Sequence, residues 1–296
     1  MQGDCKGAAG ELRTVIIRNM QQSDVLTAVE WTVREGWSSE TEHVFRAFLG
    51  YDPGGCLIGV EDERPVAMCV AVAYGGSGFL GELIVVPDRR GRGLGRQLLE
   101  HAIGYLRSRG CESIYLDGED LAVPLYERLG FRHVCDSCRF YGRVAGRRHA
   151  GVRTMKPADI DVINRFDEAA FGADRRFFLE YRLKQFPDLC RVLVADGNVS
   201  GYCMGQPGHG VVTVGPWVVV DRSGVRPLDL VESLALETGD TTLRIGVLES
   251  NARALEELRA VSGLEERGPC RRMVLGPDPG LGASEALYAI GSAAKG

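Results

Sequence analysis

The residues best suited to chemistry form one short window, rich in arginine and glycine, between Val86 and Arg96. Its glycines let the backbone turn sharply and leave main-chain N–H groups uncovered. An apolar, helix-like pattern follows, and the first turn of a helix has unpaired N–H groups with a partial positive charge. With the arginines, these groups predict a cradle for a diphosphate. The residues of this window are Arg89, Arg90, Gly91, Arg92, Gly93, Leu94, Gly95 and Arg96.

Several other classes of phosphate binder do not fit this window. The P-loop motif G-x-x-x-x-G-K-[ST] is absent, and so is a G-x-G-x-x-G early in a parallel βαβ unit. A solvated or RNA-binding Arg-Gly tract would lack the strand and the periodic helix that flank the window. The net charge of −5 and the pI near 5.7 also argue against a protein that tracks nucleic-acid phosphates. We therefore expect a diphosphate ligand of another kind.

The segments around the window predict one α/β domain with a mixed sheet. The apolar run at 79–86 indicates a strand that ends at Pro87, and apolar residues at helical spacing indicate an amphipathic helix at 93–109 that ends at Gly110. Before them we expect a strand, two helices and two strands, and after them a strand, a helix and a strand. The expected ranges are strands 14–19, 56–60, 65–74, 113–116 and 131–141, with helices 23–33, 39–49 and 121–129.

A connector rich in glycine and arginine, residues 142–151, shows no periodicity and divides the chain. We expect domains at 1–145 and 152–296. A strand, an acidic turn and a helix precede both Gly130-Phe131 and Gly263-Leu264, which predicts an internal duplication. The second domain is expected to contain helices 157–171, 227–237 and 251–261 and strands 191–195, 201–204, 211–220, 242–247 and 272–275.

The first half resembles the GNAT superfamily of N-acetyltransferases. The family's cofactor signature, [RQ]-x-x-G-x-[GA], follows a strand written L-x-V-x-P, and both occur here, as Arg90–Gly95 and Leu83–Pro87. The later signature, L-Y-x-x-x-G-F, occurs as Leu125–Phe131. The resemblance covers residues 14–141 and implies a sheet in which one strand splays from its neighbour. It implies two GNAT-like domains, each a mixed central sheet flanked by helices.

The resemblance also implies acetyl-CoA as the acyl donor, and no metal. The pantetheine arm is expected in the gap between the splayed strands, paired with the backbone of Leu83, Ile84 and Val85. The N–H of Leu83 would face the thioester oxygen and stabilise the charge that builds there. The arginine- and glycine-rich window would hold the diphosphate. A common asparagine position of the family is Glu119 here, which leaves one usual cofactor contact in doubt.

Three side chains are candidates for the chemistry of acyl transfer to an amine, which needs a deprotonated amine and a proton for the departing thiolate. Tyr126 matches the family's usual proton donor; the alternative is a packing tyrosine on an amphipathic helix. Glu82 adjoins the splayed strand and Asp117 ends the next one, so either could be the base. The alternative for each is a surface or loop-capping carboxylate.

The second half lacks these motifs. No matching glycine pattern occurs at 221–227, Pro227 cannot donate an N–H, and Arg259 stands where Tyr126 would have its counterpart. We expect a degenerate domain that binds no acyl-CoA and that either lines the substrate site or serves the structure. An aromatic and basic cluster could form such a wall or pack internally, and packing is also favoured for Trp217. The cluster comprises Phe166, Phe171, Arg175, Arg176 and Phe177.

Composition limits the remaining possibilities. Nine scattered cysteines predict reduced thiols and a cytoplasmic protein, and the lone pair Cys135 and Cys138 favours a strand over a metal site. The sequence contains no run of 18 apolar residues, so we expect no membrane span. We expect acetyl transfer from acetyl-CoA to a primary amine of a small molecule or peptide. The alternative is a non-catalytic regulatory module that senses acyl-CoA; the acceptor and the oligomeric state stay open.

Overall fold

The computed structural model describes residues 15–220 and 226–296, and its elements follow the same order in the two halves. The first half contains β1 (Ile16–Asn19), α1 (Val25–Arg34), α2 (Glu42–Tyr51), β2 (Cys56–Glu61), β3 (Arg64–Tyr74), β4 (Ser77–Val85), α3 (Leu94–Ser108), β5 (Ser113–Gly118), α4 (Val123–Arg128) and β6 (Arg132–Gly142). The second half contains β7 (Val152–Thr154), α5 (Ile160–Phe171), α6 (Arg176–Gln185), β8 (Cys190–Ala195), β9 (Asn198–Pro207), β10 (Val211–Val219), α7 (Leu228–Ala235), β11 (Thr242–Leu248), α8 (Ala252–Arg259), β12 (Leu264–Leu275) and β13 (Leu287–Ala289).

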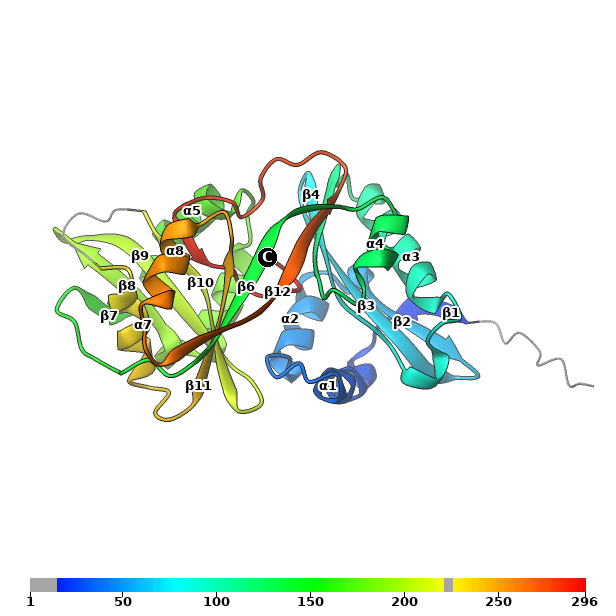
Figure 1. The fold of residues 1–296 in the computed structure, drawn as a ribbon, viewed down its shortest axis with the longest axis horizontal. Coiled ribbons are helices and arrows are strands. Elements are labelled where there is room, and N and C mark those ends of the chain that lie inside the picture. Colours follow the sequence, from blue (N-terminus) through cyan, green and yellow to red (C-terminus); the bar gives the residue numbers. More distant parts are fainter. Residues whose placement is uncertain (1–14, 221–225) are drawn as a thin grey trace, which may run out of the picture.

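The strands join into one mixed sheet that runs through both halves. Its order is β1-β2-β3-β4-β5-β12-β6-β11-β10-β9-β8-β7, with β13 paired to β10. β12, from the second half, therefore lies between β5 and β6, and β6 lies between β12 and β11. Figure 1 shows these two long strands, green and orange, side by side between the two lobes. The last long strand of each half thus pairs with a strand of the other half. The mixed α/β sheet flanked by helices is as predicted.

Helices cover both faces of the sheet. Successive residues of a strand point to opposite faces, and in β3 Cys69 joins the core under α3 while Val70 joins the core under α1 and α2. The core that contains Val70 is shared by both halves, because α5 and α6 of the second half pack into it. In this core the rings of Phe48 on α2 and Phe178 on α6 lie 6.1 Å apart. On the other face, α7 and α8 cover the second half as α3 and α4 cover the first.

β4 and β5 separate part-way along their length. They pair in parallel only from Ser77 and Ser113 to Leu80 and Leu116. Just beyond, the pairing of β4 with β3 shifts, so that Glu82 and Leu83 both lie opposite a single residue of β3. Such a bulge bends a strand and redirects its side chains. The predicted splay is confirmed, and its open end lies beside the start of α3.

Three elements were not expected from the sequence, namely β7, α6 and β13, and only residues 272–275 of β12 were expected as a strand. None of the helices in the described parts of the chain is long and apolar enough to cross a membrane. The eight cysteines within those parts, including Cys135 and Cys138, are free thiols.

Candidate active site

A cavity of about 930 Å³ lies at the open end of the gap between β4 and β5. Its walls include segment 35–40 between α1 and α2 and, from the second half, parts of β11 and β12 and residues 293–294. Of the catalytic and cofactor-binding candidates in the first half, all but Arg92 line this cavity. Those residues are Glu82, Leu83, Ile84, Val85, Arg90, Gly91, Gly93, Leu94, Gly95, Arg96, Asp117 and Tyr126.

The glycines of the window shape its backbone. Gly91 and Gly93 have φ of 75° and 83°, in the left-handed region that side chains disfavour. A Cβ added to either would meet no atom within 4 Å, so the space beside them is free for a ligand. α3 begins at Leu94 and its first N–H groups have no partner within the helix. The loop and the helix start together fit a diphosphate.

Most of the window's arginines already have partners. Arg90 donates from Nε to the Val85 carbonyl at 2.8 Å and pairs with Glu35. Arg89 lies 2.6 Å from Glu61, and Arg96 pairs with Glu100. Arg92 is exposed and has no ion pair with any described residue. Arg90 therefore also braces the loop against β4, and the main-chain N–H groups and Arg92 are the groups most available to phosphate.

Glu82 sits on the bulge of β4 and is buried, with a φ of 52° that is unusual for a residue with a side chain. Burial raises its pKa well above the usual range, and the nearby carboxyl of Glu40 raises it further. The two carboxyls can share a hydrogen bond only when one keeps its proton. Glu40 itself accepts a hydrogen bond from Ser39 Oγ at 2.6 Å. Because its pKa is raised, the ionised carboxylate of Glu82 binds a proton more readily than an ordinary carboxylate does.

A third buried charged residue, Lys295, interacts electrostatically with Glu82 and Glu40 and was not expected from the sequence. Its segment runs along β4, where a Cβ on Gly81 would lie 2.5 Å from Cα of Ala294. The hydroxyl of Tyr74 donates to the Lys295 carbonyl at 2.9 Å. Burial and the charge of Arg182 lower the pKa of Lys295 to about 8, and its positive charge in turn lowers that of Glu82. Nothing in the local sequence pattern marks residue 295, because only the fold brings it to β4.

Tyr126 reaches the cavity from α4. Its ring packs on the end of β5, where a Cβ on Gly118 would lie 2.6 Å from the ring, so only glycine fits there. Burial raises the pKa of its hydroxyl, which keeps the proton in place. Nearby, Glu119 accepts a hydrogen bond from Trp37 Nε1 at 3.1 Å, which ties the loop after β5 to the segment after α1.

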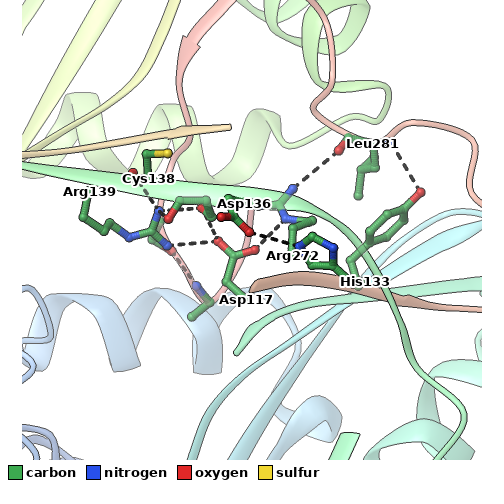
Figure 2. A network of polar contacts seen from close by, with 12 residues as sticks. Asp117, His133, Asp136, Cys138, Arg139, Arg272 and Leu281 are labelled. Atoms are coloured by element: carbon green, nitrogen blue, oxygen red, sulfur yellow. Dashed lines mark hydrogen bonds and ion pairs between the residues drawn. The ribbon is translucent and has the colours of Figure 1, made fainter. Parts of the chain in front are cut away.

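Asp117 lies at the junction of β5, β6 and β12, fully buried between two guanidinium groups (Figure 2). Arg272 donates to it at 2.5 Å and Arg139 at 3.0 Å, and Ser137 Oγ donates at 2.8 Å. Burial alone would raise its pKa, but the two arginines lower it below the usual value. A carboxylate held in this way is poorly suited to accept a proton, so the geometry favours Glu82 over Asp117 as the base.

The second half has the same strand layout with different residues at the decisive points. β10 carries a bulge at Gly215-Pro216, in the position of Glu82-Leu83 in β4. It therefore offers neither a carboxylate nor, at proline, an N–H. β10 and β11 also part after Val214 and Ile245, but there β13 pairs with β10 at Trp217 and Val218. The chain itself fills the gap that is open in the first half.

The other residues singled out in the second half lie outside the cavity, packed in the core or paired with other side chains. Trp217 is fully buried against Tyr288. Arg259 is exposed and pairs with Glu266. The aromatic and basic cluster does not line the large cavity; Arg175, for example, is buried in an ion pair with Asp167 at 2.7 Å. The segment at 221–225 lies outside the described residues.

Family models match both halves. The Acetyltransferase (GNAT) family matches residues 22–131, and an Acetyltransferase (GNAT) domain matches residues 163–289. The chain belongs to the GNAT acetyltransferases. It carries two GNAT domains in tandem, which share one sheet.

Relatives of this GNAT chain have varied acceptors. A ribosomal protein bS18-alanine N-acetyltransferase of Salmonella typhimurium is 34% identical over 97 residues, 32% of this chain and 66% of that protein. A mycothiol acetyltransferase of Thermobispora bispora is 45% identical over 109 residues, 34% of this chain and 36% of that protein. The chain thus spans about a third to two thirds of these relatives. A solved structure from Pyrococcus horikoshii superimposes with a TM-score of 0.78 at 24% sequence identity. The match covers 95% of this chain and 96% of the Pyrococcus chain, so the two share a fold.

Proposed function

We propose that this protein transfers acetyl from acetyl-CoA to a primary amine of a small molecule or peptide, by direct attack in the first GNAT domain. The observation that carries the proposal is that Glu82 and Tyr126 line one cavity, from the two sides of the gap between β4 and β5. The diphosphate cradle at Gly91–Gly95 lines the same cavity. The similarity to a bS18-alanine N-acetyltransferase and to a mycothiol acetyltransferase supports acetyl transfer without selecting the acceptor.

Three groups of this chain have roles in the proposed reaction. Bound acetyl-CoA supplies a thioester carbonyl, whose C–S bond breaks as the C–N bond to the amine forms. Glu82 accepts the proton that the amine loses, directly or through water. The N–H of Leu83 stabilises the negative charge on the carbonyl oxygen, and Tyr126 donates its proton to the leaving sulfur. Amine and thioester thereby become amide and thiol, and a proton returned through solvent from Glu82 restores Tyr126.

We further propose that the second GNAT domain binds no acyl-CoA. β13 lies where a pantetheine arm would pair, and Pro216 has no N–H for an oxyanion. The second domain instead completes the acceptor side of the first, with Arg244, residues 267–270 and residues 293–294 in the cavity wall.

A screen of primary amines with acetyl-CoA tests the proposal. We expect release of CoA with at least one amine and a product heavier by one acetyl group, detected by mass spectrometry. Glu82→Gln should abolish turnover while acetyl-CoA still raises the melting temperature. If acetyl-CoA stabilised the protein but no amine in a broad set of small molecules and peptides were acetylated, the protein would instead be the acyl-CoA-sensing regulatory module.

A further inference from the structure

Two arginines of the second domain contact one tyrosine in the cavity wall. Arg244 on β11 donates from Nε to the hydroxyl of Tyr141, on β6, at 3.0 Å. The guanidinium carbon of Arg267, on β12, lies 4.4 Å from the centre of the same ring. All three side chains line the cavity. The strand exchange creates this group, because β6 lies between β11 and β12.

Neither guanidinium has a carboxylate partner among residues 15–220 and 226–296. Their neighbours do, since Arg139 pairs with Asp117 and Arg259 with Glu266. Two positive charges that both contact the side chain of Tyr141 repel each other. An anion between them would relieve that repulsion, and planar guanidinium groups suit the oxygens of a carboxylate or phosphate.

Arg244 lies within electrostatic reach of the proposed base, because its charge lowers the pKa of Glu82, and Arg244 and Glu82 line the same cavity. Glu82 and Glu40 line one part of the cavity, and Arg244 and Arg267 line another. A neutral amine would leave these two arginines without an anionic partner.

We propose that Arg244 and Arg267 bind an anionic group, carboxylate or phosphate, on the acceptor and so place its amine at Glu82. The acceptor is then an amine that carries a negative charge. This assignment rests on the proposed function, and it adds the two residues that select the acceptor.

Matched pairs of amines test it. One series compares aminoalkanoates from glycine to 6-aminohexanoate with alkylamines of the same length; a second compares phosphoethanolamine with ethanolamine. We expect a higher kcat/KM for the anionic member, by on the order of ten- to a hundredfold at the length that fits. The double variant Arg244→Gln/Arg267→Gln should lose this preference, through a higher KM for the anionic member of each pair. Arg253→Gln, on the exposed face of α8, is the matched control.

Equal or better turnover of the neutral members would overturn the assignment, as would an equal loss for both members in the double variant. Reduced affinity of the double variant for acetyl-CoA would also overturn it, because the arginines would then serve the donor. If no amine is acetylated, titration calorimetry in the presence of saturating CoA still decides. Binding of an anionic amine that the double variant loses supports the anion site even though the proposed function fails, and absence of such binding refutes the site.

Discussion

Three buried groups at the proposed centre differ mainly in their electrostatic partners. Glu82 shares its surroundings with another carboxyl, Glu40, and with one lysine. Asp117 is also a buried carboxylate, yet two arginines hold it in its charged form. The hydroxyl of Tyr126 has no hydrogen-bond partner within the described parts of the chain, and burial, with a smaller effect of Glu119, raises its pKa. Partners, more than residue type, thus separate a candidate base from a structural anion.

Replacing Tyr126 with phenylalanine removes the proposed acid and little else. The ring still packs against Gly118 and Phe131, and no hydrogen bond to a described residue is lost. We expect kcat to fall by roughly a hundred- to ten-thousandfold, the usual contribution of a general acid. The melting temperature and the affinity for acetyl-CoA, measured by thermal shift and calorimetry, should stay near those of the unmodified protein. Full activity in this variant would show that the thiolate takes its proton elsewhere.

The pH dependence of turnover should respond to the charges around Glu82. The base must be ionised, so kcat/KM rises as the pH passes through the pKa of Glu82, which is raised. Lys295→Met removes a positive charge and should move that rise to higher pH. Glu40→Gln removes a neighbouring carboxyl and should move it to lower pH. Profiles measured with one acceptor keep the amine's own titration constant, and shifts in the same direction, or none, would contradict the role of Glu82.

At the scale of elements, the junction of β5, β6 and β12 is held by charge as well as by main-chain pairing. Asp117 comes from β5, Arg139 from β6 and Arg272 from β12, so one carboxylate joins three strands from two halves (Figure 2). Arg272 is nearly fully buried. A buried charge without its partner is costly.

Asp117→Asn should therefore destabilise the fold more than it impairs chemistry. We expect a loss of about 3–5 kcal/mol in the free energy of unfolding, the cost of leaving buried arginines without a partner. Because the pKa of Asp117 is lowered by folding, its contribution is present above its unfolded-state pKa and is lost as the pH falls through the folded-state value. Denaturant titrations across pH measure both effects.

Asp136→Asn is the control for this variant, since Asp136 pairs with Arg271 nearer the surface. It should cost no more than about 1 kcal/mol. Unchanged stability together with lost turnover in Asp117→Asn would instead identify Asp117 as the base.

On the scale of the whole molecule, the two GNAT domains share one sheet, in which the gap between β4 and β5 is open and β13 fills its counterpart beside β10. Both strands that pair with β6, namely β11 and β12, come from the second half, and β12 also pairs with β5 of the first half (Figure 1). Residues 284–296 then run from the filled gap of the second domain to β4 of the first, where Ala294 meets Gly81. The second domain thereby shapes the active cavity of the first.

Division of the chain tests this exchange. A cut between Arg148 and His149 lies in a connector without helix or strand, so it breaks no element. Each fragment alone would expose the edges that β6 and β12 normally cover. We expect both to be insoluble or unfolded by circular dichroism when expressed alone, and a folded, acetyl-CoA-binding complex when they are expressed together. A first fragment that folds cooperatively as a monomer would show that the domains are independent at the predicted boundary.

Calorimetric titration should give one acetyl-CoA per chain, since β13 fills the second gap. Gly93→Val forces a branched side chain into the left-handed region at the start of α3 and should abolish binding. The residue is exposed, so the fold should persist. Two molecules bound per chain, or one still bound to Gly93→Val, would mean that the second domain binds the cofactor.

The sequence by itself determined the family, the mixed fold and the candidate residues of the first domain, because their signals are local. The spacing of glycines, the strand before them and the tyrosine motif each lie within one short stretch of chain. It missed α6, whose apolar residues do not fall on one face, and the first part of β12, whose polar residues do not alternate like those of a half-buried strand.

Only the tertiary structure decided which of the candidate carboxylates is paired with arginines, which strands are exchanged and what fills the second gap. Those outcomes depend on contacts between residues far apart in the sequence, such as Asp117 with Arg272 and Gly81 with Ala294. No short pattern encodes them. The contacts of Arg244 and Arg267 with Tyr141 likewise depend on the tertiary structure, because these residues come from three strands of two domains.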